Sequence, residues 1–108
     1  MASSQHAEDL AQEIQMISTQ CEDMRRASDR IQGQQATLKA DIDTLTARQK
    51  QLPSDDERAL GIADQISQMK DHWAILTQRY RQIAAALAEH EQHRGELQQQ
   101  LDDMKAVP

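Results

Sequence analysis

Apolar side chains recur along the first half of the chain at alternating spacings of four and three residues, which is the spacing of one stripe on a helix. The positions of this stripe are Leu10, Ile14, Ile17, Cys21, Met24, Ser28, Ile31, Gln35, Leu38, Ile42, Leu45, Gln49 and Leu52. Because the spacing repeats every seven residues, it predicts a helix that winds around another helix in a coiled coil.

A second stripe with the same spacing follows Pro53. Its positions are Ile62, Ile66, Met69, Trp73, Leu76, Tyr80, Ile83, Leu87, His90, Arg94, Leu97, Leu101 and Met104. Pro53 ends the first helix because its ring lacks an amide donor and clashes with the preceding turn. Ser54, followed three residues later by Glu57, fits a capping box at the start of the next helix.

These signals predict an all-α chain, folded as a single domain over residues 1–108. We expect a first helix over about 7–52, a turn at 53–54 and a second helix over about 55–105. A connection this short makes the helices antiparallel neighbours, so the predicted fold is a long antiparallel helical hairpin. With Ile14 and Trp73 at heptad position a, the glycines at 33, 61 and 95 fall away from the seam, where glycine would pack poorly.

Small residues beside the seam widen its apolar face. The small residues at position e are Ala11, Ser18, Thr46, Ala63, Thr77 and Ala84, and Ala86 adds a small residue at position g. Two-stranded coils usually carry charges there, whereas small side chains let further helices approach. We therefore expect two hairpins to dimerise into an elongated antiparallel four-helix bundle. A heteromeric bundle and a lone hairpin are the alternatives.

The core and partner interface should be formed by the large apolar members of the stripes. These are Leu10, Ile14, Ile17, Met24, Ile31, Leu38, Ile42, Leu45, Ile66, Met69, Trp73, Leu76, Tyr80, Ile83, Leu87, Leu97 and Leu101. We expect the two aromatic residues to be core anchors, with a partner-binding hot spot as the alternative. Cys21 should be a small buried hydrophobe, with a disulfide across a dimer or a redox role as the alternatives.

Five polar residues interrupt the stripes, namely Ser28, Gln35, Gln49, His90 and Arg94. Buried polar groups cost stability unless they are hydrogen-bonded, and in coiled coils they often set the register and oligomeric state. Gln35 and Ser28 lie about as far before the turn as Trp73 and Tyr80 lie after it. We therefore expect the slim polar side chains to face the two rings.

Composition and charge narrow the class of partner. Among 108 residues 28% are charged, 2% are aromatic and none is Phe, which is typical of long helices and unlike a thick globular core. The net charge is −6 and basic residues alternate with acidic ones, so we expect no binding to nucleic acid or to anionic membranes. No run of residues is apolar enough to span a membrane, and residues 1–6 are unlike a secretory signal. One cysteine cannot form an internal disulfide, and we expect a cytoplasmic protein.

Candidate chemistry is sparse. His90 and His93 with Glu89 form the one cluster worth testing as a metal site, but zinc requires three or four ligands and the first helix offers no second histidine cluster. Catalysis requires converging groups in a concave pocket, which a coiled coil lacks by itself. We therefore expect no metal, no cofactor, no small-molecule substrate and no enzymatic activity.

One stretch of the second stripe resembles the last helix of a spectrin repeat. The resemblance is carried by Ile66, Met69, Trp73, Leu76 and Tyr80, about a quarter of the chain with its flanks, and it implies a three-helix bundle with a cytoskeletal role. A spectrin repeat needs a turn within residues 1–52. Gly33 is the one candidate, and the heptad spacing continues through it.

The sequence thus predicts a protein–protein interaction module that acts as a scaffold, spacer or assembly subunit. Its expected partners are a second copy of itself or other helical proteins. The alternatives are a helical chaperone or regulator that captures one client helix, and a cytoskeletal spectrin-like repeat.

Overall fold

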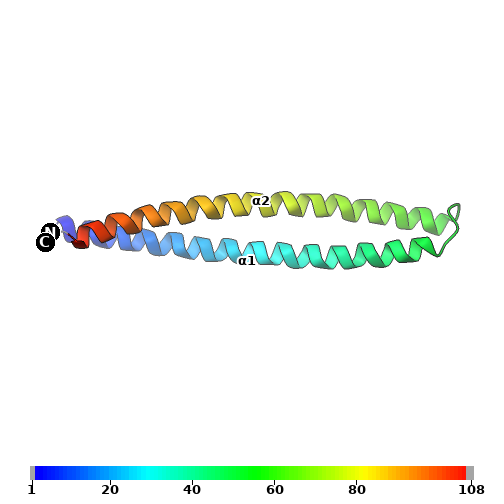
Figure 1. Ribbon diagram of the computed structural model, residues 1–108, viewed down its shortest axis with the longest axis horizontal. Coiled ribbons are helices and arrows are strands. Elements are labelled where there is room, and N and C mark those ends of the chain that lie inside the picture. The colour runs from blue at the N-terminus through cyan, green and yellow to red at the C-terminus, as the bar shows by residue number, and fades with distance from the viewer. Residues whose placement is uncertain (1, 107–108) are drawn as a thin grey trace. The chain divides into compact units, whose positions relative to one another are not determined.

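The structure, a computed structural model, describes residues 2–106, which form two long helices. Helix α1 spans Ala2–Lys50 and helix α2 spans Glu57–Ala106 (Figure 1). No strand occurs in this part of the chain. The predicted all-α fold class is therefore confirmed.

The helix boundaries differ from those expected. α1 begins five residues earlier than the predicted residue 7 and ends two residues before residue 52. The last turn closes with short-range bonds, from the Gln51 amide to the Arg48 carbonyl (3.2 Å) and from the Leu52 amide to the Gln49 carbonyl (3.1 Å). Leu52 lies outside the helix because a residue before proline is pushed out of the helical conformation.

The cap of α2 lies at Asp56, and the expectation of a cap at Ser54 is wrong. The Asp56 carboxylate accepts a hydrogen bond from the Arg58 amide (2.8 Å). The backbone carbonyl of Asp56 accepts hydrogen bonds from the Ala59 and Leu60 amides. Residues 53–56 form a turn, in which the Asp56 amide donates a hydrogen bond to the Pro53 carbonyl (3.1 Å). Glu57 is consequently the first helical residue of α2 and not the partner of a capping box.

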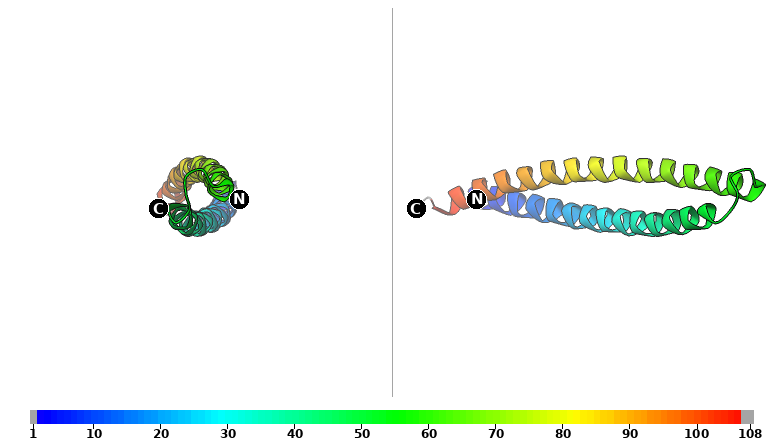
Figure 2. Two further views of the ribbon diagram at one scale, coloured as in Figure 1. Left: turned by 90° about the vertical axis from the view of Figure 1, so that its right-hand side faces the viewer. Right: turned by 45° about the vertical axis from the view of Figure 1, so that its right-hand side comes forward.

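The chain divides into two compact units. Unit 1 comprises Met1–Ser28 and Gln82–Pro108, of which 2–28 and 82–106 are described, and unit 2 comprises Asp29–Arg81. Within each unit a segment of α1 runs antiparallel to a segment of α2, and the two further views show these segments side by side (Figures 1 and 2). Unit 2 includes the turn and is a helical hairpin, as predicted.

Helix α1 passes through Gly33 without a break. The spectrin-like alternative needs two helices in this region, so the three-helix arrangement is wrong for this chain. All three glycines lie within helices, and a Cβ atom built on any of them would meet no atom within 4 Å. Their predicted placement away from the seam is confirmed.

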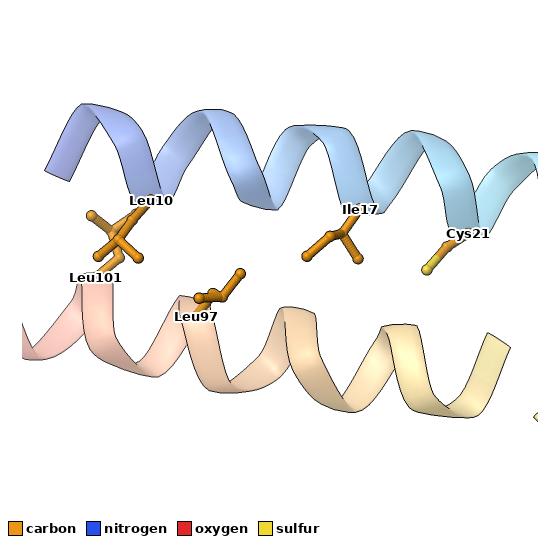
Figure 3. Packing of buried hydrophobic residues seen from close by; sticks show 5 residues of the cluster. All are labelled: Leu10, Ile17, Cys21, Leu97 and Leu101. Atoms are coloured by element: carbon orange, nitrogen blue, oxygen red, sulfur yellow. The ribbon is translucent and has the colours of Figure 1, made fainter. Parts of the chain in front are cut away.

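The core of unit 1 is a thin aliphatic layer between the two helix segments. Leu10, Ile17 and Cys21 project from α1 toward Leu97 and Leu101 of α2 (Figure 3). Ala7, Ile14, Leu87 and Met104 pack against this cluster. Cys21 has no exposed surface, which confirms it as a small buried hydrophobe.

Unit 2 has a core of the same kind. Its buried side chains are Ile31, Ala59, Ile62, Ile66 and Leu76. Neither α1 nor α2, within the described residues, contains a stretch long and apolar enough to cross a lipid bilayer.

Candidate interaction surface

Two pairs of polar side chains join the two helices beside the seam of unit 1. Arg25 and Glu91, both at position e, form an ion pair on one side. On the other side His93 Nε2 lies 3.7 Å from Glu13 Oε1, and both of these residues occupy position g. Pairs of e with e and of g with g are those of an antiparallel coil. Because the side chains of Arg25 and Glu91 are about half exposed, their ion pair contributes only about 0.2–1 kcal/mol and acts mainly on register.

The polar seam residues of unit 1 are all partly buried. One ring nitrogen of His90 forms a hydrogen bond within its own helix, with Nδ1 lying 2.8 Å from the Ala86 carbonyl oxygen. Ser28 and Arg94 are partly buried, as His90 is. For His90 the observed bond is local, so it does not by itself link the two helices.

In unit 2 the polar seam residues bond from α1 to α2. Gln35 Nε2 donates to Thr77 Oγ1 (2.8 Å), and Gln49 Nε2 donates to the Ala59 carbonyl (3.5 Å). Beside the seam, Gln32 Nε2 donates to the Tyr80 hydroxyl (3.3 Å). These bonds place Gln35 at the level of Thr77, one helical turn from Trp73, so the expected pairing of slim polar side chains with the two rings is shifted along α2.

Trp73 departs from the predicted core. It occupies a seam position, yet 36% of its surface is exposed, whereas Leu76 in the next layer is 1% exposed. A two-helix seam covers a side chain from one neighbouring helix only, and an indole is too large to be enclosed in this way. Every other member of the predicted core and interface set is buried or partly buried.

The exposed indole lines an open hollow of about 380 Å³ between the two helices of unit 2. The other lining residues are Lys39, Ile42 and Lys70. Leu60 lies further along the same side of α2 at position b, with 58% of its surface exposed. Because positions a, e and b are neighbours around a helix, these side chains belong to one face. We call it the Trp73 surface, formed by Lys39, Ile42, Leu60, Lys70 and Trp73.

A second hollow, of about 580 Å³, lies on the other side of the seam of unit 2. Its exposed lining is mainly apolar in area, although several polar side chains border it, and the lining residues are Leu38, Asp41, Thr44, Leu45, Gln65, Gln68, Met69 and His72. Within residues 2–106 no three His, Cys, Asp or Glu side chains are grouped as a metal site requires.

In the turn of unit 2, the pairing of Asp56 with Arg58 shifts the titration of both groups. The side chain of Arg58 and its backbone amide hydrogen-bond to the Asp56 carboxylate and lower the pKa of that carboxyl group. The same pairing raises the pKa of the Arg58 guanidinium. Because the Asp56 carboxylate accepts a hydrogen bond from the Arg58 amide, it stabilises the start of α2.

Two residues of the cores and one residue of the Trp73 surface were not predicted from the sequence. Ala7 and Ala59 extend the two stripes by one position each, at the same three-residue step before Leu10 and Ile62, so the spacing contained the signal. Leu60 lies outside the stripe, and its one signal is a bulky aliphatic side chain at an outward position.

No family model, curated protein or solved structure matches this chain. In unit 2 the Trp73 surface leaves a large apolar side chain of the seam exposed.

Proposed function

We propose that this protein is a non-enzymatic helical interaction module that self-associates into a four-helix bundle and serves as a scaffold, spacer or assembly subunit. The observation that carries this proposal is the partial exposure of Trp73 at a position where a coiled coil buries its side chains. Removing apolar surface from water favours association by about 25 cal/mol per Å², against which the entropic cost of association counts. A further helix over the hollow would complete the layer that two helices leave open.

The small side chains beside the seam support the same conclusion. Ala63 and Thr77 at position e are partly buried in unit 2, and Ala84 is exposed on α2 of unit 1. Such residues let another helix approach closely. The chain has a net charge of −6, so protein helices are more suitable partners than nucleic acids or anionic membranes.

We place the protein in the cytoplasm, since its single cysteine is buried and unpaired. A free thiol is the usual state of cysteine in a reducing compartment. A small-molecule substrate and a cofactor form no part of the proposal.

A second candidate function is a chaperone or regulator that captures one client helix. The open hollow beside Trp73 favours this candidate, because a single amphipathic helix would fit along it. The two functions differ in occupancy. A scaffold's surface is covered in the assembled state, whereas a regulator's surface stays open until its client arrives.

The fluorescence of Trp73, the one tryptophan in the chain, separates the two candidates. For the self-associating module we expect its emission to shift to shorter wavelength as protein concentration rises, with little binding of a hydrophobic dye. Emission independent of concentration together with dye binding would favour client capture. A constant emission with no dye binding would contradict both.

A further inference from the structure

We propose that the occupant of the Trp73 surface is a second copy of this chain, and that Leu60 of each copy inserts into the hollow beside Lys39 and Ile42 of the other. This inference rests on the self-association proposed above and specifies the face that carries it. All the residues involved belong to unit 2.

Unit 2 leaves two large apolar side chains exposed on one side of α2. Leu60 and Trp73 occupy heptad positions b and a, which flank position e on the helix surface. Ile75, also exposed, occupies position c and belongs to the opposite side. A face with one protruding leucine and one hollow can be complementary to itself, as a two-fold dimer requires.

Charge favours this occupant. Lys39 and Lys70 border the hollow, and neither forms an ion pair with another residue among those that the structure describes. Leu60 has carboxylates one turn before and one turn after it, at Glu57 and Asp64. Insertion of Leu60 would bring these carboxylates toward the two ammonium groups of the other copy, which favours the encounter and its orientation.

The spacing along α2 fixes the orientation of the two copies. Leu60 precedes Lys70 and Trp73 by 10 and 13 residues, which corresponds to roughly 15–20 Å along the helix. If the two α2 helices are antiparallel about an axis midway between these points, both leucines reach both hollows at once. The midpoint falls near Ala63 and Ser67, whose small side chains permit close helix approach.

The larger hollow on the other side suits this occupant less. Asp41 lies in its lining, together with glutamine and threonine side chains. A leucine flanked by carboxylates would there meet another carboxylate, so like charges would oppose the contact.

Cysteine cross-linking tests the arrangement directly. In a Cys21→Ala background, Lys39→Cys and Leu60→Cys are combined and the protein is oxidised. Within one chain these positions cannot be bridged, because Lys39 lies beside Lys70 and Trp73, roughly 15 Å along the helix from Leu60, and a disulfide needs Cα atoms within about 7 Å. We therefore expect a covalent dimer on a denaturing gel.

Two control variants test whether the cross-link is specific to the proposed arrangement. Thr44→Cys with Leu60→Cys places the first thiol in the opposite hollow and should give no covalent dimer. Leu60→Cys alone should give none either, because the antiparallel arrangement keeps the two Leu60 positions apart. Efficient cross-linking of the single variant would contradict the arrangement. Circular dichroism checks that each variant retains its helices.

A substitution in the native background gives an independent readout. Leu60→Ala should raise the dissociation constant of the dimer about tenfold or more, since the lost contact is a buried leucine. Met16→Ala is the control, because Met16 has nearly the same exposure as Leu60, 60% against 58%, and lies in unit 1.

The outcomes separate this inference from the proposed function. A stable dimer that neither cross-links between Lys39→Cys and Leu60→Cys nor responds to Leu60→Ala would overturn the inference and leave self-association intact. A chain that is monomeric at all concentrations would overturn both.

Discussion

The side-chain amide of Gln35 donates a hydrogen bond to the Thr77 hydroxyl across the part-buried seam of unit 2, over 2.8 Å. The bond explains how a glutamine is tolerated at a position that favours apolar side chains, because its amide is satisfied by the other helix. It also joins one residue of α1 to one residue of α2, so it opposes any slip of the helices past each other.

Thr77→Val should destabilise the protein by about 0.5–1.5 kcal/mol, since it removes the hydroxyl and leaves the Gln35 amide without this acceptor. Urea unfolding followed by circular dichroism measures the change. Thr44→Val is the control, because the Thr44 hydroxyl donates to the Ala40 carbonyl of its own exposed helix surface. Equal effects of the two substitutions would show that the bond between the helices contributes nothing.

Leu76→Ala should cost about 2–5 kcal/mol in the free energy of unfolding, because Leu76 is 1% exposed and its truncation leaves a cavity in the seam. The neighbouring Ile75 is 50% exposed, and Ile75→Ala should cost less than about 1 kcal/mol. Denaturant unfolding of both variants makes the comparison. A larger loss at residue 75 would contradict the heptad register.

Gly33→Ala should raise stability by about 0.5–1 kcal/mol. Gly33 lies inside α1 with helical backbone geometry, and an added methyl group would meet no atom within 4 Å. Alanine therefore gains helix propensity without a steric cost. A lower midpoint of thermal unfolding for this variant would indicate that Gly33 serves a contact that the isolated chain does not make.

The cap at Asp56 should make the stability of unit 2 depend on pH in the acidic range. Arg58 lowers the pKa of Asp56 below its usual 3.8 in the folded state. For a lowered carboxyl pKa, the stabilisation is fully present above 3.8 and is lost as the pH falls through the lower folded value.

Asp56→Asn isolates this contribution, because asparagine retains a capping oxygen and carries no charge. We expect the wild-type melting temperature to exceed that of the variant at neutral pH, and the difference to shrink as the pH is lowered below 3.8. A difference that stays constant over this range would show that the carboxylate charge plays no part.

The seven-residue spacing predicted much of the structure because a repeat of this length has one physical interpretation. It identified the two helices, the burial of Cys21 and the outward placement of Gly33, while the short turn at Pro53 predicted the antiparallel pairing of the helices. The spacing does not report side-chain volume, so it could not show that the Trp73 indole exceeds the space of a two-helix seam. Nor could it decide between Ser54 and Asp56, since both residues are good caps and the turn after Pro53 selects the second.

Sedimentation equilibrium of the full chain over a wide range of concentration tests the central claim most directly. Self-association through the Trp73 surface predicts a mass that rises from 12.3 kDa, the mass of one chain, to a plateau at twice that value. Leu60→Ala should shift this rise to higher concentration. A mass that stays at 12.3 kDa up to the highest soluble concentration would contradict the account.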